Sequence, residues 1–274
     1  MKAAVHERYG SPDVLEIRDV PTPEPRAGEI QVRVHAATVT RTDTCALRAH
    51  PWFVRPATGL FRPNLKILGL DFAGTVAAIG DGVRRFAPGA RVFGLTPGGY
   101  GAHAEYVCVP ADGMVATMPT GLAFAGAVVG EGAWYANTYL ERFGLGPGHE
   151  ILIYGASGAI GTAALQLSKF YGASVTAVVS TRHVELAREL GADRVIDYTT
   201  DDFTRSDRSF DFVLDAVGKT SYSRCKRLLK PSGVFAATDL GPGWQNVFFA
   251  LGSWITRSGR VVFPTPRSRP SLVE

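Results

Sequence analysis

Three glycines at regular spacing form a candidate phosphate-binding loop. Gly155, Gly158 and Gly161 follow the apolar run 151–154 and precede an amphipathic stretch expected to be helical over 160–171. Small residues are needed at such a turn because the chain bends tightly, the backbone approaches a pyrophosphate, and the helix packs closely on a sheet. The N–H groups and the dipole at the helix N-terminus favour an anion. A purely structural tight turn is the alternative, but the flanking strand and helix favour a dinucleotide site.

The end of the next predicted strand indicates which dinucleotide would bind. A site for NADH usually has Asp or Glu about 20 residues after the glycine loop, where it takes the ribose hydroxyls. Here the predicted strand 174–179 is followed by Ser180, Thr181 and Arg182, and no carboxylate occurs before Glu185. A hydroxyl and a guanidinium suit the 2′-phosphate of NADPH. Ser180 or Thr181 could also cap the following helix, and the two roles are compatible.

The remaining metal-binding and nucleophilic residue types are scattered. Cys45, Cys108 and Cys225 lie far apart without a CxxC spacing, which excludes a disulfide framework and a four-cysteine zinc lobe. The six histidines, including His35 and His103, have no neighbouring candidate ligands in the sequence. We therefore expect structural or surface roles for the histidines.

Two further matches to catalytic patterns have simpler explanations. Tyr222 and Lys226 have the Tyr-x-x-x-Lys spacing of short-chain dehydrogenases, but they follow Gly161 too closely for that fold. We expect this match to be an accident on a surface helix. Asp215 ends a predicted strand directly before the sequence Ala-Val-Gly. We expect it to hold that loop rather than to act as an acid.

Two different patterns of elements would position these residues. The first ~115 residues contain short apolar runs separated by Gly, Pro and Asp, which is typical of a compact barrel or sandwich. Residues 121–143 are expected to be mainly helical. Strands and helices then alternate, which implies right-handed crossovers and a parallel sheet. We expect strands at 30–36, 72–79, 104–109, 151–154, 174–179, 194–197, 210–216 and 234–238, and helices at 160–171, 182–190 and 222–229.

Composition narrows the class of protein. The 274 residues are 46% apolar and 20% charged, which is typical of a soluble protein with one large or two modest domains. The net charge is +4, and the positive excess is spread along the chain with one local concentration at Arg257, Arg260, Arg267 and Arg269. Without a nucleic-acid motif we expect no nucleic-acid partner. The N-terminus has no signal-peptide pattern, and Val247–Ile255 is about half as long as a membrane span. A cytoplasmic protein without membrane contact is expected.

Several stretches together resemble the zinc-independent medium-chain dehydrogenase/reductase superfamily, in its quinone oxidoreductase or zeta-crystallin-like branch. The resemblance runs from residue 1 to about 265 and implies an α/β protein of two domains. These would be a GroES-like β-rich barrel domain at 1–118 and a Rossmann doubly wound parallel-sheet domain at 119–274. The matching stretches are 69–76 (GLDFAGTV), 99–109 (GYGAHAEYVCV), 148–161 (GHEILIYGASGAIG), 190–198 (LGADRVIDY), 210–218 (FDFVLDAVG) and 229–233 (LKPSG).

The resemblance also implies an activity and a set of binding residues. The activity is hydride transfer from NAD(P)H to a quinone, an α,β-unsaturated carbonyl or a related electrophile, in a cleft between the domains. Carried over by position, the cofactor-binding residues are those of the glycine loop, the adenosine end and the nicotinamide side. They are Gly155, Ser157, Gly158, Ala159, Ile160 and Gly161, then Ser180, Arg182 and Tyr198, then Ala216, Val217, Gly218, Asp239 and Leu240.

Departures from zinc-dependent relatives bear on the chemistry. Those relatives keep a Cys near position 40 and Gly-His-Glu near 69–71, whereas this chain has Thr40 and Gly69-Leu70-Asp71. A catalytic zinc needs three protein ligands, so we expect no metal and a conjugated electrophile as substrate. Thr40 takes the place of a family asparagine facing the nicotinamide. Asp43 is either an orienting carboxylate or a helix cap. Trp52 and Phe53 either cover a planar substrate or pack locally.

The C-terminus departs from the pattern of these relatives. They continue beyond the point where this chain stops, with a segment that returns to the catalytic domain. We therefore expect a truncated chain that keeps its cofactor site, with weak or absent turnover and exposed apolar surface. The alternatives to a reductase are a catalytically impaired NADPH-binding protein, a polyketide-type enoyl reductase module, and a related alcohol dehydrogenase-like reductase. A homodimer through 260–264 is a further expectation.

Overall fold

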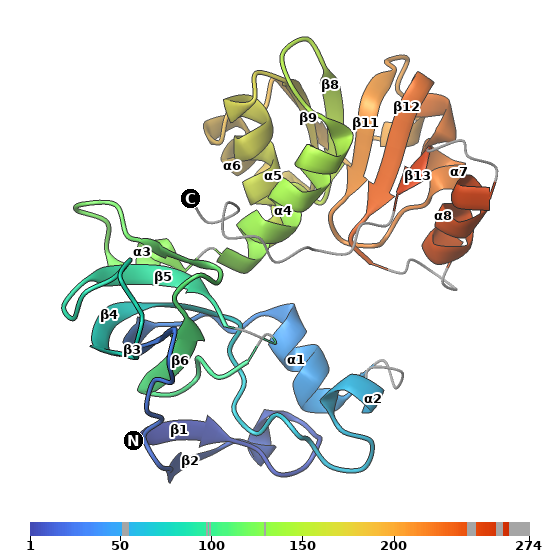
Figure 1. Cartoon of the computed structure of the whole chain (residues 1–274). Coiled ribbons are helices and arrows are strands. Elements are labelled where there is room, and N and C mark those ends of the chain that lie inside the picture. The colour runs from blue at the N-terminus through green and yellow to red at the C-terminus, as the bar shows by residue number, and fades with distance from the viewer. Residues whose placement is uncertain are drawn as a thin grey trace. The chain divides into compact units, whose positions relative to one another are not determined.

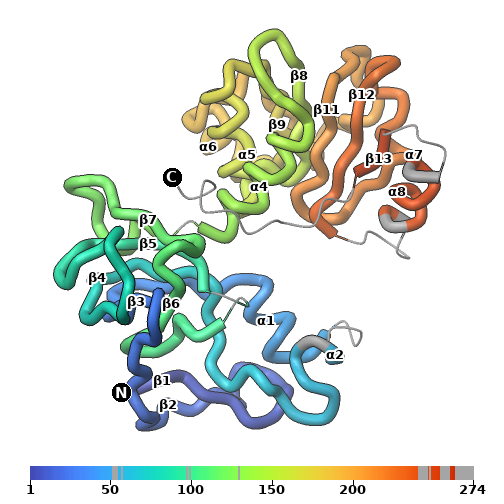
Figure 2. Tube along the Cα trace, viewed as in Figure 1, coloured from blue at the N-terminus to red at the C-terminus, as the bar shows by residue number. Residues whose placement is uncertain are grey.

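The chain forms two compact units that divide between Glu131 and Gly132. The computed structural model describes residues 1–50, 55–96, 98, 100–128, 130–239, 245–255 and 260–262. Figure 1 and the trace in Figure 2 show an antiparallel β structure in the N-terminal unit and a sheet flanked by helices in the second. The division falls inside one helix, α4 (Gly130–Phe143). The domain boundary expected between residues 118 and 119 stays a prediction.

The N-terminal unit is built from antiparallel strands, as the short apolar runs predict. One sheet has the strand order β6-β3-β4-β5-β7, and β1 pairs with β2 separately. The strands are β1 (Lys2–Val5), β2 (Glu16–Asp19), β3 (Glu29–Ala36), β4 (Asp71–Ile79), β5 (Arg91–Leu95), β6 (Tyr106–Pro110) and β7 (Val115–Thr117). The helices are α1 (Arg41–Arg48), α2 (Arg55–Thr58) and α3 (Phe124–Ala127).

Alternation along the strands builds the core of this unit. Ile30 and Val32 of β3 are fully buried, and they pack with Phe72 and Val76 of β4 in one hydrophobic cluster. Side chains in a strand alternate between faces, so residues two apart share the buried side. The sheet is therefore a rigid support for the loop that leaves β3 and enters α1.

The second unit is an all-parallel sheet, as the alternation of strands and helices predicts. Its strand order is β10-β9-β8-β11-β12-β13. The order changes direction between β8 and β11, which is the place where ligands bind in open sheets of this kind. The elements are β8 (Glu150–Tyr154), α5 (Ala159–Phe170), β9 (Ser174–Val179), α6 (Val184–Glu189), β10 (Arg194–Asp197), β11 (Phe210–Asp215), α7 (Tyr222–Cys225), β12 (Leu229–Ala237), α8 (Gln245–Ile255) and β13 (Val261–Val262).

Helices cover both faces of this sheet, and the buried strand residues divide between them. Ile151 and Ile153 of β8 belong to the cluster that includes residues of α4, α5 and α6. Leu152, which points the other way, belongs to the cluster under α7 and α8. Figure 1 shows the same division of the helices about the sheet. A strand buried on both faces explains the continuous apolar run 151–153.

Three predicted elements differ from the structure. The helix expected at 182–190 begins as a 3-10 turn at Thr181–His183 before α6, and the helix expected at 222–229 ends in a 3-10 turn at Lys226–Leu228. The strand expected from 234 begins earlier, at Leu229. Phe210 pairs with Leu229 and Phe212 with Val234, so residues 230–233 form an irregularity between these pairs. This accommodates Pro231, whose missing N–H cannot join a regular ladder.

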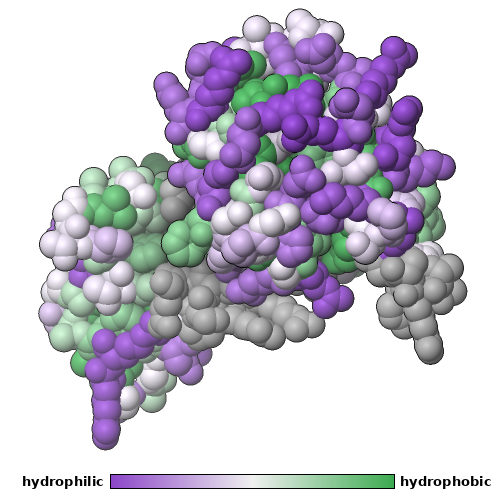
Figure 3. Space-filling model, turned by 90° about the horizontal axis from the view of Figure 1, so that it is seen from above, coloured by the Kyte–Doolittle hydropathy of each residue, from purple (hydrophilic) through white to green (hydrophobic). Residues whose placement is uncertain are grey.

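One face of the molecule carries both hydrophilic and apolar side chains. Hydrophilic side chains cover much of the visible face in Figure 3, with smaller apolar areas between them. On the second unit Lys230 bridges Glu150 at 3.0 Å and Asp211 at 2.8 Å. Across the described part of the chain, no helix is long and apolar enough to cross a membrane.

Candidate functional site

The predicted cofactor-binding residues follow the ends of five neighbouring parallel strands. Since these strands all run in the same direction, the loops after β10, β9, β8, β11 and β12 leave one edge of the sheet. Three of the loops are in direct contact: a Cβ at Gly155 would lie 2.8 Å from Val217, and a Cβ at Gly218 would lie 2.3 Å from Asp239. The structure thus brings the predicted residues of these loops together. Leu240 lies outside the described residues.

The glycine loop is shaped by close backbone contacts. Gly155 has φ +79°, a conformation that residues with a side chain rarely adopt. A Cβ at Gly161 would lie 2.2 Å from the carbonyl oxygen of Gly155, so the loop can pack on the helix only if this residue is glycine. Gly158 is the N-cap of α5, and Ser157, Gly158, Ala159 and Ile160 all keep solvent exposure. An open helix N-terminus of this kind suits an anion.

Polar side chains follow β9, as the sequence predicts. Ser180 is at the N-cap position of the 3-10 turn but makes no side-chain capping bond. Its hydroxyl lies 3.2 Å from Nδ1 of His183, a residue that we did not single out from the sequence. Arg182 is exposed. The hydroxyl and the guanidinium are therefore available to a ligand at this edge.

A carboxylate that sequence reasoning missed also lies at this edge. Asp197 ends β10 and pairs with Val179 across the parallel ladder, so it reaches the turn that follows β9. Its Oδ1 accepts hydrogen bonds from the backbone N–H of Thr199 at 2.9 Å and from the Thr199 hydroxyl at 2.7 Å. Hydrogen bonds from Thr181 and Thr199 hold the pKa of Asp197 below its ordinary value. The available signal was the order of the strands, because strands that follow each other with one helix between them often pair in a parallel sheet.

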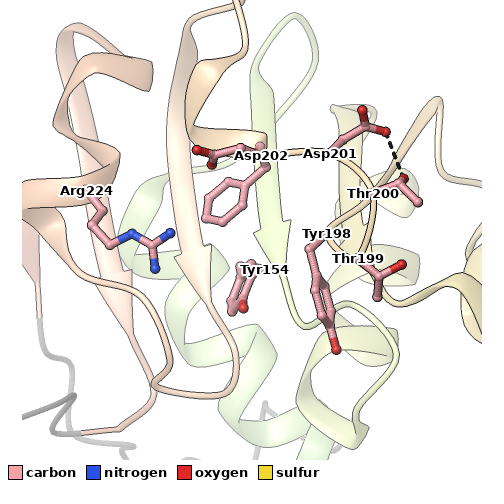
Figure 4. A pocket seen from close by; sticks show the side chains of 8 residues that line it. Tyr154, Tyr198, Thr199, Thr200, Asp201, Asp202 and Arg224 are labelled. Carbon is pink, nitrogen blue, oxygen red and sulfur yellow. Dashed lines mark hydrogen bonds between the residues drawn. The ribbon is translucent and has the colours of Figure 1, made fainter.

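A pocket of about 260 Å³ lies beside Tyr198, on the same edge. Figure 4 shows Tyr154 between Arg224 and Tyr198, with Asp202 and Asp201 nearby. The Tyr154 ring centroid lies 4.9 Å from that of Phe203 and 6.0 Å from that of Tyr198. Burial raises the pKa of the Tyr154 hydroxyl, which therefore stays protonated at neutral pH. Aromatic walls with carboxylates and a guanidinium at the rim suit a flat, polar ring system.

Asp215 holds the loop after β11, as its place in the sequence predicts. It is fully buried, and its carboxylate accepts backbone hydrogen bonds from Val217 at 3.1 Å, Gly218 at 2.8 Å and Thr220 at 2.9 Å. Burial raises its pKa, and these hydrogen bonds oppose the rise. Its role in shaping the loop is confirmed.

The two predicted catalytic residues lie in the N-terminal unit and are bonded to each other. Thr40 and Asp43 form a capping box at the start of α1. The Thr40 backbone N–H and hydroxyl donate to Asp43 Oδ2 at 2.8 Å and 3.0 Å, and Asp43 Oδ1 accepts from the Gly69 N–H at 2.8 Å. Of the two roles left open for Asp43, the structure shows the helix cap. Action of Thr40 or Asp43 on a substrate stays a prediction.

Two neighbouring threonines bond to carboxylates that sequence reasoning did not select. Thr38 donates to Asp71 Oδ1 from its N–H, at 3.1 Å, and from its hydroxyl, while the Thr42 hydroxyl donates to Glu131. Burial raises the pKa of Glu131, hydrogen bonds from Thr40 and Thr42 oppose the rise, and the charges of Asp43 and Asp71 add to it. No local sequence signal marks Glu131, because its partner lies 89 residues away.

Comparisons with known proteins agree with this architecture. Residues 26–120 match the alcohol dehydrogenase GroES-like domain, and residues 159–263 match the zinc-binding dehydrogenase family. The chain is 32% identical to the chloroplastic quinone-oxidoreductase homolog of Spinacia oleracea over 91% of its own length and 80% of that protein. The chain belongs to the medium-chain dehydrogenase/reductase superfamily. Its relatives place it in the quinone oxidoreductase-like branch.

Two further relatives are similar over most of this dehydrogenase/reductase chain. The NADPH-dependent alkenal/one oxidoreductase of Arabidopsis thaliana is 32% identical over 92% of the chain and 67% of that protein. The structure of the quinone oxidoreductase from Coxiella burnetii superposes with a TM-score of 0.86 at 27% identity, over 100% of this chain and 85% of the other. The chain is therefore similar to an oxidoreductase of alkenals and to one of quinones.

The positions that carry zinc in other medium-chain dehydrogenase/reductases have other roles here. Thr40 caps a helix, and Asp71 accepts from Thr38. His103, for which we expect a structural role, has its Nε2 2.7 Å from the Thr38 carbonyl oxygen. Within the described ranges, no three His, Cys, Asp or Glu side chains are grouped so that they could hold a metal ion. The expectation of a zinc-independent reaction stays a prediction. Trp52 and Phe53 lie outside the described residues.

Tyr222 and Lys226 match the dyad of short-chain dehydrogenases by chance, and in this medium-chain dehydrogenase/reductase Tyr222 has a structural role. Tyr222 packs between Phe235, at a ring distance of 6.3 Å, and Phe249, at 5.7 Å. Lys226 is exposed and begins the 3-10 turn after α7. Tyr222 therefore anchors α7 to the sheet and to α8.

Proposed function

We propose that this chain is an NADPH-dependent oxidoreductase that transfers hydride to a quinone or an α,β-unsaturated carbonyl compound without zinc. The observation that carries the proposal is the shared edge of the parallel sheet, where the open glycine loop, the Ser180–Arg182 turn and the contact between Gly218 and Asp239 meet. A dinucleotide is long enough to span such a row of loops.

The glycine loop fits a pyrophosphate. The first helical hydrogen bond of α5 runs from the Thr162 N–H to the Gly158 carbonyl oxygen at 2.8 Å, so the N–H groups of Ala159, Ile160 and Gly161 precede it. Such N–H groups at a helix start, together with the helix dipole, attract phosphate oxygens. A Cβ at Gly158 would have no neighbour closer than 3.7 Å, so the space above this turn is open to a ligand.

Two groups of residues support the orientation of the cofactor. At the adenosine end we assign the pocket beside Tyr198 to the adenine ring, and Ser180 and Arg182 to the 2′-phosphate. At the other end Ala216, Val217, Gly218 and Asp239 would line the nicotinamide, with Leu240 next in the chain. The bound cofactor would supply the hydride. The chain's own residues bind and orient it.

The substrate class rests on relatives and on the chemistry of conjugated acceptors. The Arabidopsis relative is named for alkenals and alkenones, and the spinach relative for quinones. Such electrophiles delocalise the negative charge that hydride addition creates, so they need no metal to polarise them. We propose that Thr40 and Asp43 form the polar side of the substrate site in the N-terminal unit.

The test combines turnover with cofactor binding. NADPH absorbance should fall in the presence of a quinone or an alkenal and persist with a saturated ketone. Arg182→Ala should weaken NADPH binding about tenfold and leave NADH binding unchanged, because only NADPH has the 2′-phosphate. Arg188→Ala is the matched control, since Arg188 is exposed on α6 and pairs with Glu185. Binding of NADPH with no oxidation by any acceptor would contradict the enzymatic proposal.

A further inference from the structure

The turn after β9 and the turn after β10 form a single rim. β9 and β10 are parallel neighbours, and Val179 pairs with Asp197 at their carboxyl ends. Tyr198 continues the pairing, because its N–H donates to the Val179 carbonyl oxygen at 3.0 Å. Thr181 and Thr199 therefore leave the sheet side by side, with their hydroxyl oxygens 2.7 Å apart. The sequence places a serine and an arginine on this rim, and the fold adds a carboxylate.

Asp197 directs the protons of both hydroxyls. Thr199 donates its one hydroxyl proton to Asp197 Oδ1 at 2.7 Å, so its oxygen can only accept from Thr181. The Thr181 hydroxyl also lies close enough to bond Asp197 itself. In either arrangement the Thr181 proton is donated within this cluster, to Thr199 or to Asp197, so the Thr181 oxygen can accept a hydrogen bond from a ligand but has no proton left to donate. Thr181 therefore presents a hydrogen-bond acceptor to a ligand, beside a carboxylate that is ionised at neutral pH.

An acceptor and a fixed negative charge distinguish between the two nicotinamide dinucleotides. A ribose 2′-hydroxyl donates a hydrogen bond and is neutral, so it matches this part of the rim. A 2′-phosphate only accepts and carries about −1.5 to −2 charges at neutral pH, so it matches Arg182 but is repelled by Asp197. The rim thus contains Arg182, which favours NADPH, and Asp197, which favours NADH.

We propose that Asp197 is a specificity-determining residue, which opposes the 2′-phosphate of NADPH and holds Thr181 as an acceptor for the ribose hydroxyls of NADH. This rests on the proposed function, since it concerns the same dinucleotide site. On this proposal the chain uses both NADPH and NADH. Its preference between them depends on how strongly Arg182 attracts the 2′-phosphate and how strongly Asp197 repels it. Removing the carboxylate shifts that balance toward NADPH.

Binding titrations of NADPH and NADH to the full chain test the proposal without turnover. Asp197→Asn should raise the affinity for NADPH relative to NADH about fivefold, the effect of one unit charge a few ångström away in water-exposed surroundings. Glu185→Gln is the matched control, because it removes an equal charge from an exposed carboxylate that is bonded to Arg188. It should change the ratio by less than about twofold.

A second variant covers the case in which Asp197→Asn fails to fold. Thr181→Val removes the hydroxyl acceptor that Asp197 holds for the ribose hydroxyls of NADH, so the ratio should again move toward NADPH. An unchanged ratio, or a shift toward NADH, in the folded variants would overturn the role of Asp197 and leave the proposed function intact. If the wild-type chain bound neither dinucleotide, the proposed function itself would be overturned together with this proposal.

Discussion

Individual buried carboxylates in this chain hold the backbone around the two candidate sites. Asp215 and Asp43 accept several donors each and shape the loop after β11 and the start of α1. The role of Asp215 could be predicted, because a strand-end Asp before Ala-Val-Gly bonds residues close to it in sequence. Glu131 could not be predicted, because it is bonded through Thr42, on a distant element.

Glu131 is expected to make stability depend on pH. Burial raises the pKa of this carboxyl above its ordinary value of 4.5, so at pH values between the unfolded and the folded pKa the folded chain holds a proton that the unfolded chain has released. The stability from this proton is fully present below the unfolded pKa and is lost as pH rises through the folded pKa. Glu131→Gln keeps a neutral side chain at all pH values. It should therefore increase the free energy of unfolding by about 1 kcal/mol at pH 8 and change it little at pH 4.

Denaturant unfolding of both proteins at the two pH values measures this effect. Glu141→Gln, on the exposed side of the same helix, provides the control and should show no such difference between pH 4 and pH 8. Equal or lower stability of Glu131→Gln at pH 8 would contradict the assignment.

At the scale of elements, the strand–loop–helix around α5 was predictable and the lengths of weaker elements were not. An apolar run, three glycines and an amphipathic stretch define β8, the loop and α5 within one residue of the expected bounds. By contrast, α1 is a short helix of mostly polar residues, and its start is marked by the capping box of Thr40 and Asp43. β12 begins at Leu229 because this residue already pairs with Phe210, and residues 230–233 of β12 form an irregularity before the next pair.

The two glycines at the start of α5 should respond differently to a methyl group. Gly161→Ala places a Cβ 2.2 Å from the Gly155 carbonyl oxygen, so it should cost about 1–3 kcal/mol of stability as well as NADPH binding. Gly158→Ala meets nothing closer than 3.7 Å and should keep its stability. Its methyl group would lie where we expect the pyrophosphate, so NADPH affinity should fall about tenfold. Thermal unfolding and cofactor titration of both variants separate the two effects, and normal NADPH affinity in Gly158→Ala would speak against this loop as the phosphate site.

At the scale of the whole molecule, the two units of the chain contribute different groups of residues. The N-terminal unit contains an antiparallel sheet and holds Thr40 and Asp43 at the start of α1, and the second unit gathers five loops at one edge of a parallel sheet. Dinucleotide binding should therefore be a property of the second unit. The chain spans 67% of the length of the Arabidopsis relative and 80% of the length of the spinach relative.

Hydrogen exchange of the full chain should show which segments bind NADPH. At about 100 times Kd, binding stabilises the occupied state by ~2.7 kcal/mol, so opening in the bound region should slow up to about a hundredfold. We expect slowed exchange in the segments 156–161, 180–183 and 198–203. The paired strands β1 and β2 should exchange as before and serve as the internal control. Protection that excludes these three segments would place the cofactor elsewhere.

The sequence by itself determined the type of sheet, the glycine loop and the loop-holding Asp215, because these depend on periodicity and on bonds between residues close in the chain. Only the tertiary structure decided which side chains meet at each site. Parallel pairing brings Thr181 to Thr199 across 18 residues, and packing of α4 brings Glu131 to Thr42 across 89. Strand register and helix packing arise from the whole fold, so no local pattern reveals that the rim with Arg182 also holds the carboxylate of Asp197.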